Sequence, residues 1–308
     1  MPELPDLALY IEALQSRIIG ATLKRVDIAG PFLLRTFEPP PGAVCGQRVA
    51  SLTRVGKRIA IGFENGMWLA LHLMIAGRLH WFEKVRKPDG RRMLAAFAFD
   101  SGCLTLTEAG SRKRAALFVL ADRAGLTALD PGGLEVMESS LEDFSRKLLS
   151  ENHTIKRALT DPHLFAGIGN AYSDEILHRA QLSPVKLTSR LAESEIAALH
   201  SAIKECLTDW IVLLRKQAAG KFPEKVTAFH EEMAVHGRYG QLCPRCGEKV
   251  QRIRHASNES NYCPRCQTGG KLLADRALSR LLREDWPRTA EELEERRAKR
   301  VSLPVLPS

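Results

Sequence analysis

Apolar residues follow two different spacings in the first 120 residues. Leu7, Ile11, Leu14 and Ile18 recur at helical spacing behind the N-terminus, and Gly20 stands where a C-terminal cap belongs. This helix would anchor the first residues against a core. Short strand-like runs follow at residues 22–28, 49–52, 58–63, 67–71, 79–82, 94–99, 104–106 and 117–120. Many short strands with little helix between them predict a β-sandwich.

The pattern becomes helical after Asp130-Pro-Gly-Gly133, which is a strong turn signal. Helices are expected over residues 141–149, around 155–159, and over 171–178, 196–214, 271–284 and 291–300. The glycine-bearing run Gly167-Ile-Gly-Asn170 opens one of these helices, and such a start can offer backbone N–H groups to a phosphate. Residues 249–254 alternate polar with apolar and predict one strand of a hairpin.

Two Cys-x-x-Cys pairs, Cys243 with Cys246 and Cys263 with Cys266, flank that hairpin. Four thiolates at this spacing match a tetrahedral site for one structural Zn²⁺. Two disulfides are the alternative, which a reducing cytosol disfavours. The other three cysteines sit singly among apolar residues and are expected to be small core side chains.

Composition and charge limit the kinds of partner that the protein is expected to have. The chain has 308 residues, 44% of them apolar, a net charge of +9 and a pI near 9.3. These values are typical of a globular protein with a polyanionic partner, although a merely basic surface is the alternative. No apolar run approaches the length of about 20 residues that spans a bilayer, and the N-terminus lacks a secretory signal. A cytoplasmic, nucleoid-associated monomer is therefore expected.

The hairpin and the N-terminus each allow a functional and a structural interpretation. Arg252 and Arg254 would share one face of the strand, so the hairpin is either a blade for a nucleic-acid groove or a stabilising ribbon. Pro2 suits the first turn of a helix. If Met1 is removed, Pro2 would instead carry a secondary amine with a pKa near neutrality. Such an amine can attack a sugar C1′ to form an iminium, with Glu3 moving protons.

Six motifs occur together in one order, and their combination resembles a known family. They are the start Pro2-Glu-Leu-Pro5, Gly56-Lys57-Arg58, His72-Leu-Met-Ile-Ala-Gly77, Ile168-Gly-Asn-Ala-Tyr-Ser-Asp-Glu175, His236-Gly-Arg-Tyr-Gly240 and the finger ending Cys-Pro-Arg-Cys-Gln267. The sequence is similar to the formamidopyrimidine-DNA glycosylase and endonuclease VIII family of base-excision-repair enzymes. The likeness covers residues 2–267.

This resemblance implies an α+β multidomain fold. It consists of an N-terminal catalytic β-sandwich with flanking helices (residues 1–133), a helix–two-turn–helix DNA-binding domain (134–240) and a Cys₄ zinc finger (241–267). A C-terminal extension (268–308) follows. Double-stranded damaged DNA is the implied partner.

The resemblance also assigns roles to single residues. Pro2 would be the nucleophile, Glu3 the acid/base residue, and Lys57 would assist sugar opening and elimination. The implied DNA-binding residues are Asn170, Lys113, Arg114 and Asn258, which join Arg252 and Arg254 of the predicted hairpin strand. Glu175 and Asp6 would lie in the layer around the catalytic residues and support them.

The sequence departs from the family pattern at four places. Asn258 stands where the family has an arginine on the lesion's phosphate, and Asp6 stands where it has a glutamate. Ile75 replaces a methionine, and Lys113-Arg-Ala115 replaces an Arg-Arg-Phe wedge. The predicted function is a glycosylase that removes oxidised bases through a proline Schiff base and cleaves the strand by elimination. The alternative is a catalytically weak protein that binds abasic sites or unusual DNA structures on the same scaffold.

Overall fold

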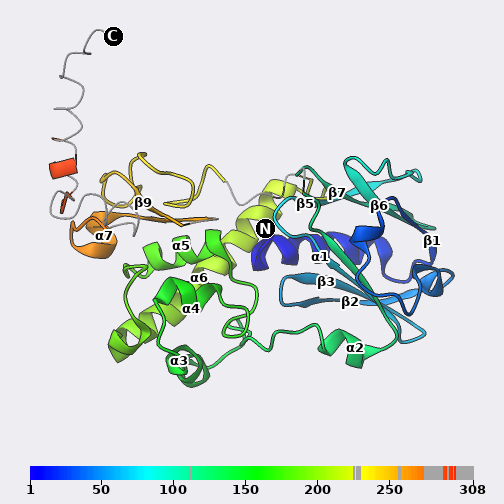
Figure 1. Ribbon diagram of the computed structural model, residues 1–308, viewed down its shortest axis with the longest axis horizontal. Coiled ribbons are helices and arrows are strands. Elements are labelled where there is room, and N and C mark those ends of the chain that lie inside the picture. The colour runs from blue at the N-terminus through cyan, green and yellow to red at the C-terminus, as the bar shows by residue number, and fades with distance from the viewer. Residues whose placement is uncertain are drawn as a thin grey trace, which may run out of the picture. The chain divides into compact units, whose positions relative to one another are not determined.

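The computed structural model describes residues 1–110, 112–224, 226, 230–255, 258–273, 287–289, 291–293 and 295. They form two compact units that interleave along the sequence (Figure 1). Unit 1 comprises residues 1–135, 161–168 and 207–228, and unit 2 comprises the remainder. Helix α6 (Glu193–Ala218) contributes residues to both units. The boundaries of the four consecutive domains rest on the sequence alone, and they stay a prediction.

Unit 1 contains two four-stranded antiparallel sheets, which confirms the predicted β-sandwich. One sheet has the order β1-β6-β7-β5 and the other the order β2-β3-β4-β8. The strands are β1 (Leu23–Ile28), β2 (Val49–Val55), β3 (Arg58–Phe63), β4 (Trp68–His72), β5 (Gly77–Phe82), β6 (Met93–Phe99), β7 (Gly102–Glu108) and β8 (Ala116–Leu120). Each overlaps a predicted apolar run.

The second sheet is covered on both faces. Ile59 and Ile61 of β3 lie in the main core, whereas Ala60 packs with Trp68 in a smaller cluster on the other face. Helix α2 (Arg123–Thr127), which the sequence pattern did not predict, supplies Leu126 to that smaller cluster. Covering both faces explains why β3 reads as continuously apolar instead of alternating.

Helix α1 (Leu4–Ile18) contacts β2 and β3 and buries one apolar face in the main core. Its buried apolar residues include the predicted Leu7, Leu14 and Ile18. Tyr10 is also fully buried, and its hydroxyl accepts a hydrogen bond from the backbone N–H of Leu79 at 3.2 Å. This packing fixes the chain's first residues against β5.

Unit 2 contains the predicted helices and the finger. The elements are α3 (Leu141–Leu149), α4 (Ile155–Thr160), α5 (Asn170–Arg179), the 3₁₀ turn η3 (Thr188–Arg190), the first part of α6, β9 (Gln251–Arg254), β10 (Glu259–Tyr262) and α7 (Pro264–Thr268). Ser140 caps α3 by accepting a hydrogen bond from the N–H of Asp143. Strands β9 and β10 form the expected antiparallel hairpin, which begins at Gln251 instead of Lys249.

Two segments of the C-terminal extension pair with each other. Lys271 pairs with Thr289 in an antiparallel bridge, and the N–H of Leu272 donates to the carbonyl of Arg288 at 2.9 Å. The expected helix start at residue 271 is therefore wrong, while residues 274–286 of that helix lie outside the described residues. Residues 291–293 and 295 are helical, as predicted, and 296–308 are not described.

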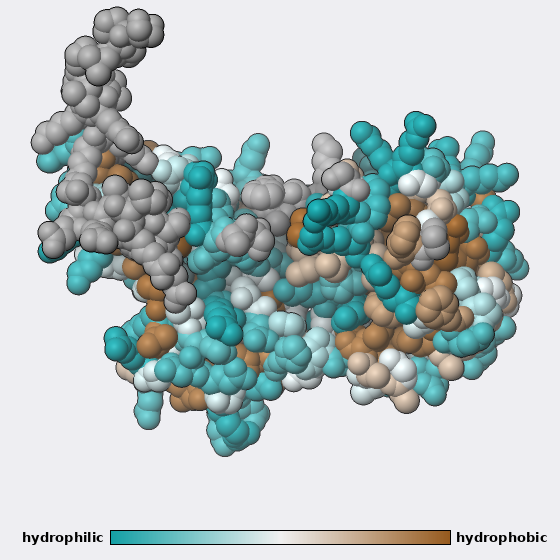
Figure 2. All heavy atoms as spheres, in the orientation of Figure 1, coloured by the Kyte–Doolittle hydropathy of each residue, from teal (hydrophilic) through white to brown (hydrophobic). Residues whose placement is uncertain are grey.

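Hydrophilic side chains dominate the visible surface of both units, with separate apolar patches among them (Figure 2). Among the residues that the structure describes, no helix is long and apolar enough to cross a membrane.

Gly77, at the start of β5, generates the first prediction. A Cβ atom there would lie 2.1 Å from the carbonyl oxygen of Leu73, which is backbone and cannot swing away. Gly77→Ala should therefore lower the free energy of unfolding by about 2–3 kcal/mol through overpacking and backbone strain. Urea denaturation measures this loss. Gly42→Ala is the control because nothing lies within 4 Å of its Cβ position. Equal stability of the two variants would contradict the prediction.

Candidate active site and metal centre

Glu3 caps the first turn of α1 in unit 1. Its carboxylate accepts a hydrogen bond from the N–H of Asp6, and its own N–H donates to the Asp6 carboxylate at 2.8 Å. The N–H of Leu4 donates to the carbonyl of Gly167 at 3.0 Å. Gly167 has φ +81°, and a Cβ atom there would lie 2.9 Å from the Leu4 Cβ, so this contact requires glycine. Pro2 and Glu3 are both buried by these contacts.

Several charged groups act on one another around this buried terminus. Burial lowers the pKa of the α-amine of Met1, and the cations Arg78 and Lys57 lower it further, while Glu3 opposes the shift. Burial also lowers the pKa of the Lys57 ammonium, again against the negative charge of Glu3. A lowered amine pKa increases the neutral fraction, which is the nucleophilic form. The structure thus brings the predicted Glu3 and Lys57 together with the chain's amine.

His72, at the end of β4, joins this cluster and was not among the predicted site residues. Burial lowers its pKa to about 4, assisted by Arg58, Lys57 and the terminal amine. The ring is therefore neutral at pH 7. Its Nδ1 accepts a hydrogen bond from the N–H of Met74 at 3.1 Å, which leaves the proton on Nε2. The signal available in the sequence was a histidine that directly follows the apolar run at residues 67–71.

The turn after His72 holds an exposed apolar side chain. Met74 has φ +52°, a left-handed conformation that is uncommon for a residue other than glycine. Ile75 follows and is 61% exposed. Arg78 closes the turn by donating to the carbonyl oxygens of Ile75 and Gly77 at 3.2 and 2.7 Å. Backbone strain beside a buried charged cluster is a common mark of a functional loop.

The basic loop that precedes β8 is held by a buried carboxylate. Glu108 accepts hydrogen bonds from the backbone N–H groups of Arg114 and Ala115, and the Lys113 ammonium donates to the Glu108 carbonyl. The Arg114 residue itself is exposed. Of the two predicted DNA-binding residues in this loop, Arg114 is the one whose side chain lies in solvent.

In unit 2, two neighbouring carboxylates on α5 are buried in different networks. Asp174 pairs with Lys156 and lies 2.8 Å from Nδ1 of His236. Glu175 accepts hydrogen bonds from the backbone N–H groups of residues 234–236 at 2.7–2.9 Å. The resemblance assigns Glu175 to support of the catalytic carboxylates. Its oxygens instead hold the segment that leads into the finger.

The other predicted residues of unit 2 lie along the finger hairpin. Asn170 donates through Nδ2 to the carbonyl of Glu259 at 3.0 Å, and its Oδ1 is buried without a partner among the described residues. Arg252 pairs with the Glu259 carboxylate at 3.1 Å and stacks 4.1 Å over the Tyr239 ring. Arg254 and Asn258 are exposed at the tip of the hairpin. Arg252 is thus partly neutralised, whereas the tip residues face solvent.

The four finger cysteines converge as the spacing predicts. All four sulfur atoms lie within 4.8 Å of one another. The Cys243–Cys266 and Cys246–Cys263 sulfur pairs are separated by 4.0 and 3.4 Å. A zinc ion with Zn–S bonds of about 2.3 Å requires sulfur separations of about 3.8 Å, so the donor set fits Zn²⁺. Four protein ligands leave no open position, so the ion would be structural.

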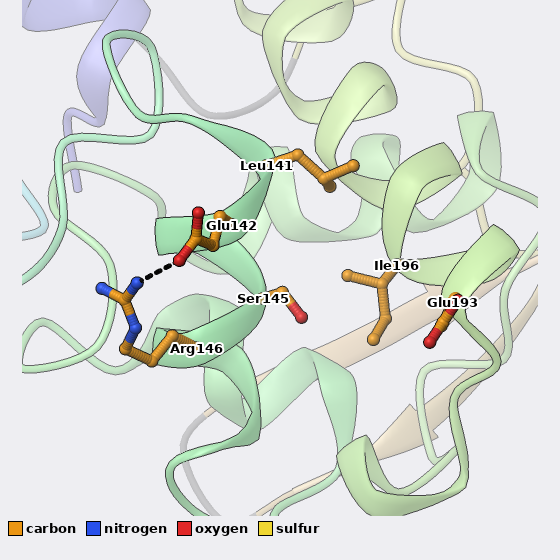
Figure 3. A pocket seen from close by; sticks show the side chains of 6 residues that line it. All are labelled: Leu141, Glu142, Ser145, Arg146, Glu193 and Ile196. Carbon is orange, nitrogen blue, oxygen red and sulfur yellow. Dashed lines mark hydrogen bonds and ion pairs between the residues drawn. The ribbon is translucent and has the colours of Figure 1, made fainter.

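A shallow pocket of about 630 Å³ lies elsewhere in unit 2, between α3 and α6 (Figure 3). Its lining residues are Leu141, Glu142, Ser145, Arg146, Glu193 and Ile196. Arg146 pairs with Glu142 at 2.7 Å and with Asp143 at 2.9 Å. Because Arg146 is engaged by these carboxylates on an open surface, we assign no chemistry to this pocket.

Asp6 generates a prediction about pH. Burial raises its pKa to about 7, whereas an exposed aspartate has a value of 3.8. A raised acid pKa means that the folded state keeps the proton longer, so the contribution of Asp6 to stability is greatest at low pH. It should fall by roughly 1 kcal/mol per pH unit as the pH rises between about 4 and 7. Asp6→Asn keeps the hydrogen-bond acceptor and should remove this dependence.

Urea denaturation at pH 5, 6 and 7 measures the effect of Asp6→Asn. Asp130→Asn, which replaces an exposed aspartate of unit 1, should retain the pH dependence of the natural chain. A slope that is unchanged in Asp6→Asn would contradict the assignment.

Models of three protein families match the chain. The formamidopyrimidine-DNA glycosylase N-terminal domain matches residues 1–117, and the H2TH domain of the same enzymes matches residues 130–218. The zinc finger found in these glycosylases and in isoleucyl-tRNA synthetase matches residues 231–269. Together they account for the sandwich, the helices of unit 2 and the finger.

Individual relatives agree with these models. The formamidopyrimidine-DNA glycosylase of Pelotomaculum thermopropionicum is 31% identical over 277 residues, which cover 87% of this chain and 99% of that protein. A structure of MutM in complex with DNA that contains carbocyclic 8-oxo-G aligns with a TM-score of 0.76 at 27% identity, covering 87% of this chain and all of that one. The Lactococcus lactis Fpg bound to abasic-site DNA aligns with a TM-score of 0.75 at 27% identity, covering 86% and 99%. The chain therefore belongs to the formamidopyrimidine-DNA glycosylase family.

Proposed function

We propose that this protein is a DNA glycosylase with abasic-site lyase activity, and that Pro2 is its nucleophile. The observation that carries the proposal is the buried cluster around the chain's amine, in which the charge of Glu3 acts on the pKa of the amine and of Lys57, and Lys57 acts on the pKa of His72. The relatives' structures with 8-oxo-G and abasic-site DNA support damaged double-stranded DNA as the partner.

Removal of Met1 would place the secondary amine of Pro2 in this cluster. The burial that lowers the pKa of the Met1 amine would act on the Pro2 amine in the same way. The neutral amine attacks C1′ of a nucleotide that has been rotated out of the duplex, and the C1′–N bond to the base breaks. The base leaves with a proton, and the sugar ring opens to leave an iminium that joins Pro2 to C1′.

Neighbouring groups supply the proton transfers. The Glu3 carboxylate, held in place by the first turn of α1, takes the amine proton and returns one to the opening sugar. The iminium acidifies the C2′ proton, whose loss expels the 3′ phosphate by β-elimination. Lys57 and the Nε2–H group of neutral His72 are suited to bind the phosphate and sugar oxygens. Hydrolysis of the iminium then releases Pro2.

Exposed residues of each unit would hold the DNA. Ile75 is suited to fill the space left by the rotated base, because it is apolar and sits on a strained turn. Arg114 in unit 1 and Arg254 at the finger tip would contact phosphates. Asn170 can use the second N–H of its amide, since only one is engaged by Glu259.

The alternative function is DNA binding with weak catalysis. Asn258 favours it, because a neutral side chain occupies the finger position where the family resemblance expects a phosphate-binding arginine. A bidentate arginine–phosphate contact is among the stronger hydrogen-bonded pairs, so its loss would reduce lesion affinity.

Trapping with borohydride on abasic DNA separates the two functions. Reduction should fix the DNA covalently to Pro2, and mass spectrometry should show a chain that begins at Pro2. Pro2→Gly should retain some trapping because a primary amine also forms a Schiff base. Glu3→Gln should lower the rate of base release at least 100-fold while DNA binding persists, since proton transfer contributes on this scale. An adduct on Lys57 would overturn the assigned roles. Tight binding without any adduct would favour the non-catalytic alternative.

Asn258→Arg tests the phosphate contact at the finger tip. The new charge should strengthen binding to abasic DNA by about 1.5–3 kcal/mol, and it should steepen the salt dependence of binding by about one unit of slope. Fluorescence anisotropy at several salt concentrations measures both. Asn152→Arg adds the same charge at another exposed site of unit 2 and is the control. Equal gains from the two variants would show a general charge effect instead of a contact at residue 258.

A further inference from the structure

Helix α5 carries a row of polar contacts, one on every fourth residue, to the finger and to the segment that leads into it. Asn170 donates to the carbonyl of Glu259, Asp174 bonds His236, and His178 bonds Cys243. Residues four apart lie on one face of a helix, so these three side chains all face the finger. Leu182 continues the row beyond the helix, where its carbonyl accepts a hydrogen bond from the Gln267 side chain at 2.9 Å.

One of these contacts reaches the metal centre itself. The Nε2 atom of His178 lies 3.2 Å from Cys243 Sγ, and both residues are almost fully buried. A cysteine that binds zinc is a thiolate and can only accept a hydrogen bond, so His178 must be the donor there. The structure describes no backbone N–H at this sulfur, whereas Cys263 Sγ accepts the N–H of Cys266 at 3.5 Å.

We propose that His178 is an outer residue of the zinc site, whose Nε2–H group donates to the Cys243 thiolate and fixes the first knuckle to α5. Four thiolates around one Zn²⁺ leave a net charge of about −2, and an N–H donor offsets part of it in a buried place. Gln267 holds the second knuckle through its backbone instead of its sulfur, because its Oε1 accepts the N–H of Cys263 at 2.8 Å while its Nε2 donates to the Leu182 carbonyl. Both knuckles are thereby tied to the region of α5.

This inference does not depend on the proposed function, since a chain without any enzymatic activity would need the same bond. It concerns zinc retention and the electronic state of one sulfur atom. Loss of an outer hydrogen-bond donor lowers metal affinity by about 10–100-fold. His178→Phe keeps a planar ring of similar size but removes the donor, while His178→Gln restores an N–H group.

The experiment uses the full-length zinc-loaded protein and measures transfer of zinc to a chromophoric chelator. His178→Phe should release zinc about 10–100-fold more readily, and His178→Gln should recover part of that loss. His200→Phe is the control, because His200 packs on Phe144 in the same unit without touching a sulfur. Unchanged release in His178→Phe, or equal release in His200→Phe, would overturn the proposal.

Cobalt(II) substitution gives a readout that a merely structural role would not move. Removing the N–H group should shift the sulfur-to-cobalt charge-transfer band of His178→Phe to lower energy, because the thiolate becomes more electron-rich. The ligand-field bands should keep the pattern of four sulfurs. A changed ligand-field pattern would make His178 a metal ligand and overturn the outer role.

A measurement on the natural chain covers the case in which His178→Phe does not fold. In the cadmium-loaded protein, NMR of ¹⁵N-labelled histidine should show the His178 proton on Nε2, protected from solvent exchange and coupled to ¹¹³Cd through the sulfur. A proton on Nδ1 would overturn the proposal, and so would a freely exchanging Nε2–H group.

Discussion

The carboxylate of Glu3 closes the first turn of α1 and also shapes the electrostatics of the site. It accepts the N–H of Asp6 as a helix cap, and its negative charge opposes the lowering of the pKa values of Lys57 and of the terminal amine. Because α1 is packed by Tyr10 and its apolar neighbours against the sandwich, the cap has little freedom to move. The position of the chain's terminal amine therefore depends on the burial of a whole helix, and the pKa values of the amine, Lys57 and His72 depend on the charges beside them.

Unit 2 depends in a similar way on α5. A short and largely polar helix such as α5 would have little stability by itself, because most helical stability in proteins comes from tertiary packing. Here it holds the segment before the finger through Asp174 and Glu175, and the finger itself through His178. Buried carboxylates are costly unless fully hydrogen-bonded, and Glu175 meets this requirement with three backbone N–H groups. The same helix begins at Asn170, so the metal centre and a proposed DNA contact share one rigid support.

The departures from the family pattern divide between exposed and buried positions. Asn258 is exposed at the finger tip, and Ile75 is exposed on a strained turn. By contrast, Asp6 is buried and keeps the reciprocal cap with Glu3 despite a side chain one methylene shorter than glutamate. Buried polar positions tolerate only changes that preserve hydrogen bonding, whereas exposed positions can change without disturbing the fold.

Local spacing determined the elements, the sandwich and the zinc ligands, because hydrophobic period and Cys-x-x-Cys geometry are short-range properties that a sequence displays directly. Tertiary structure alone decided which distant groups meet. His72 and the chain's amine are 71 residues apart in number, yet their charges interact. Glu175 was expected behind the catalytic carboxylates, but its oxygens bind residues 234–236. His178 carried no sequence signal, because a lone histidine on a helix becomes a partner of Cys243, 65 positions further along the chain, only after the intervening residues have folded. The sequence determines which chemical groups are present. Their burial and their hydrogen-bond partners, which shift pKa values and orient donors, arise only from packing.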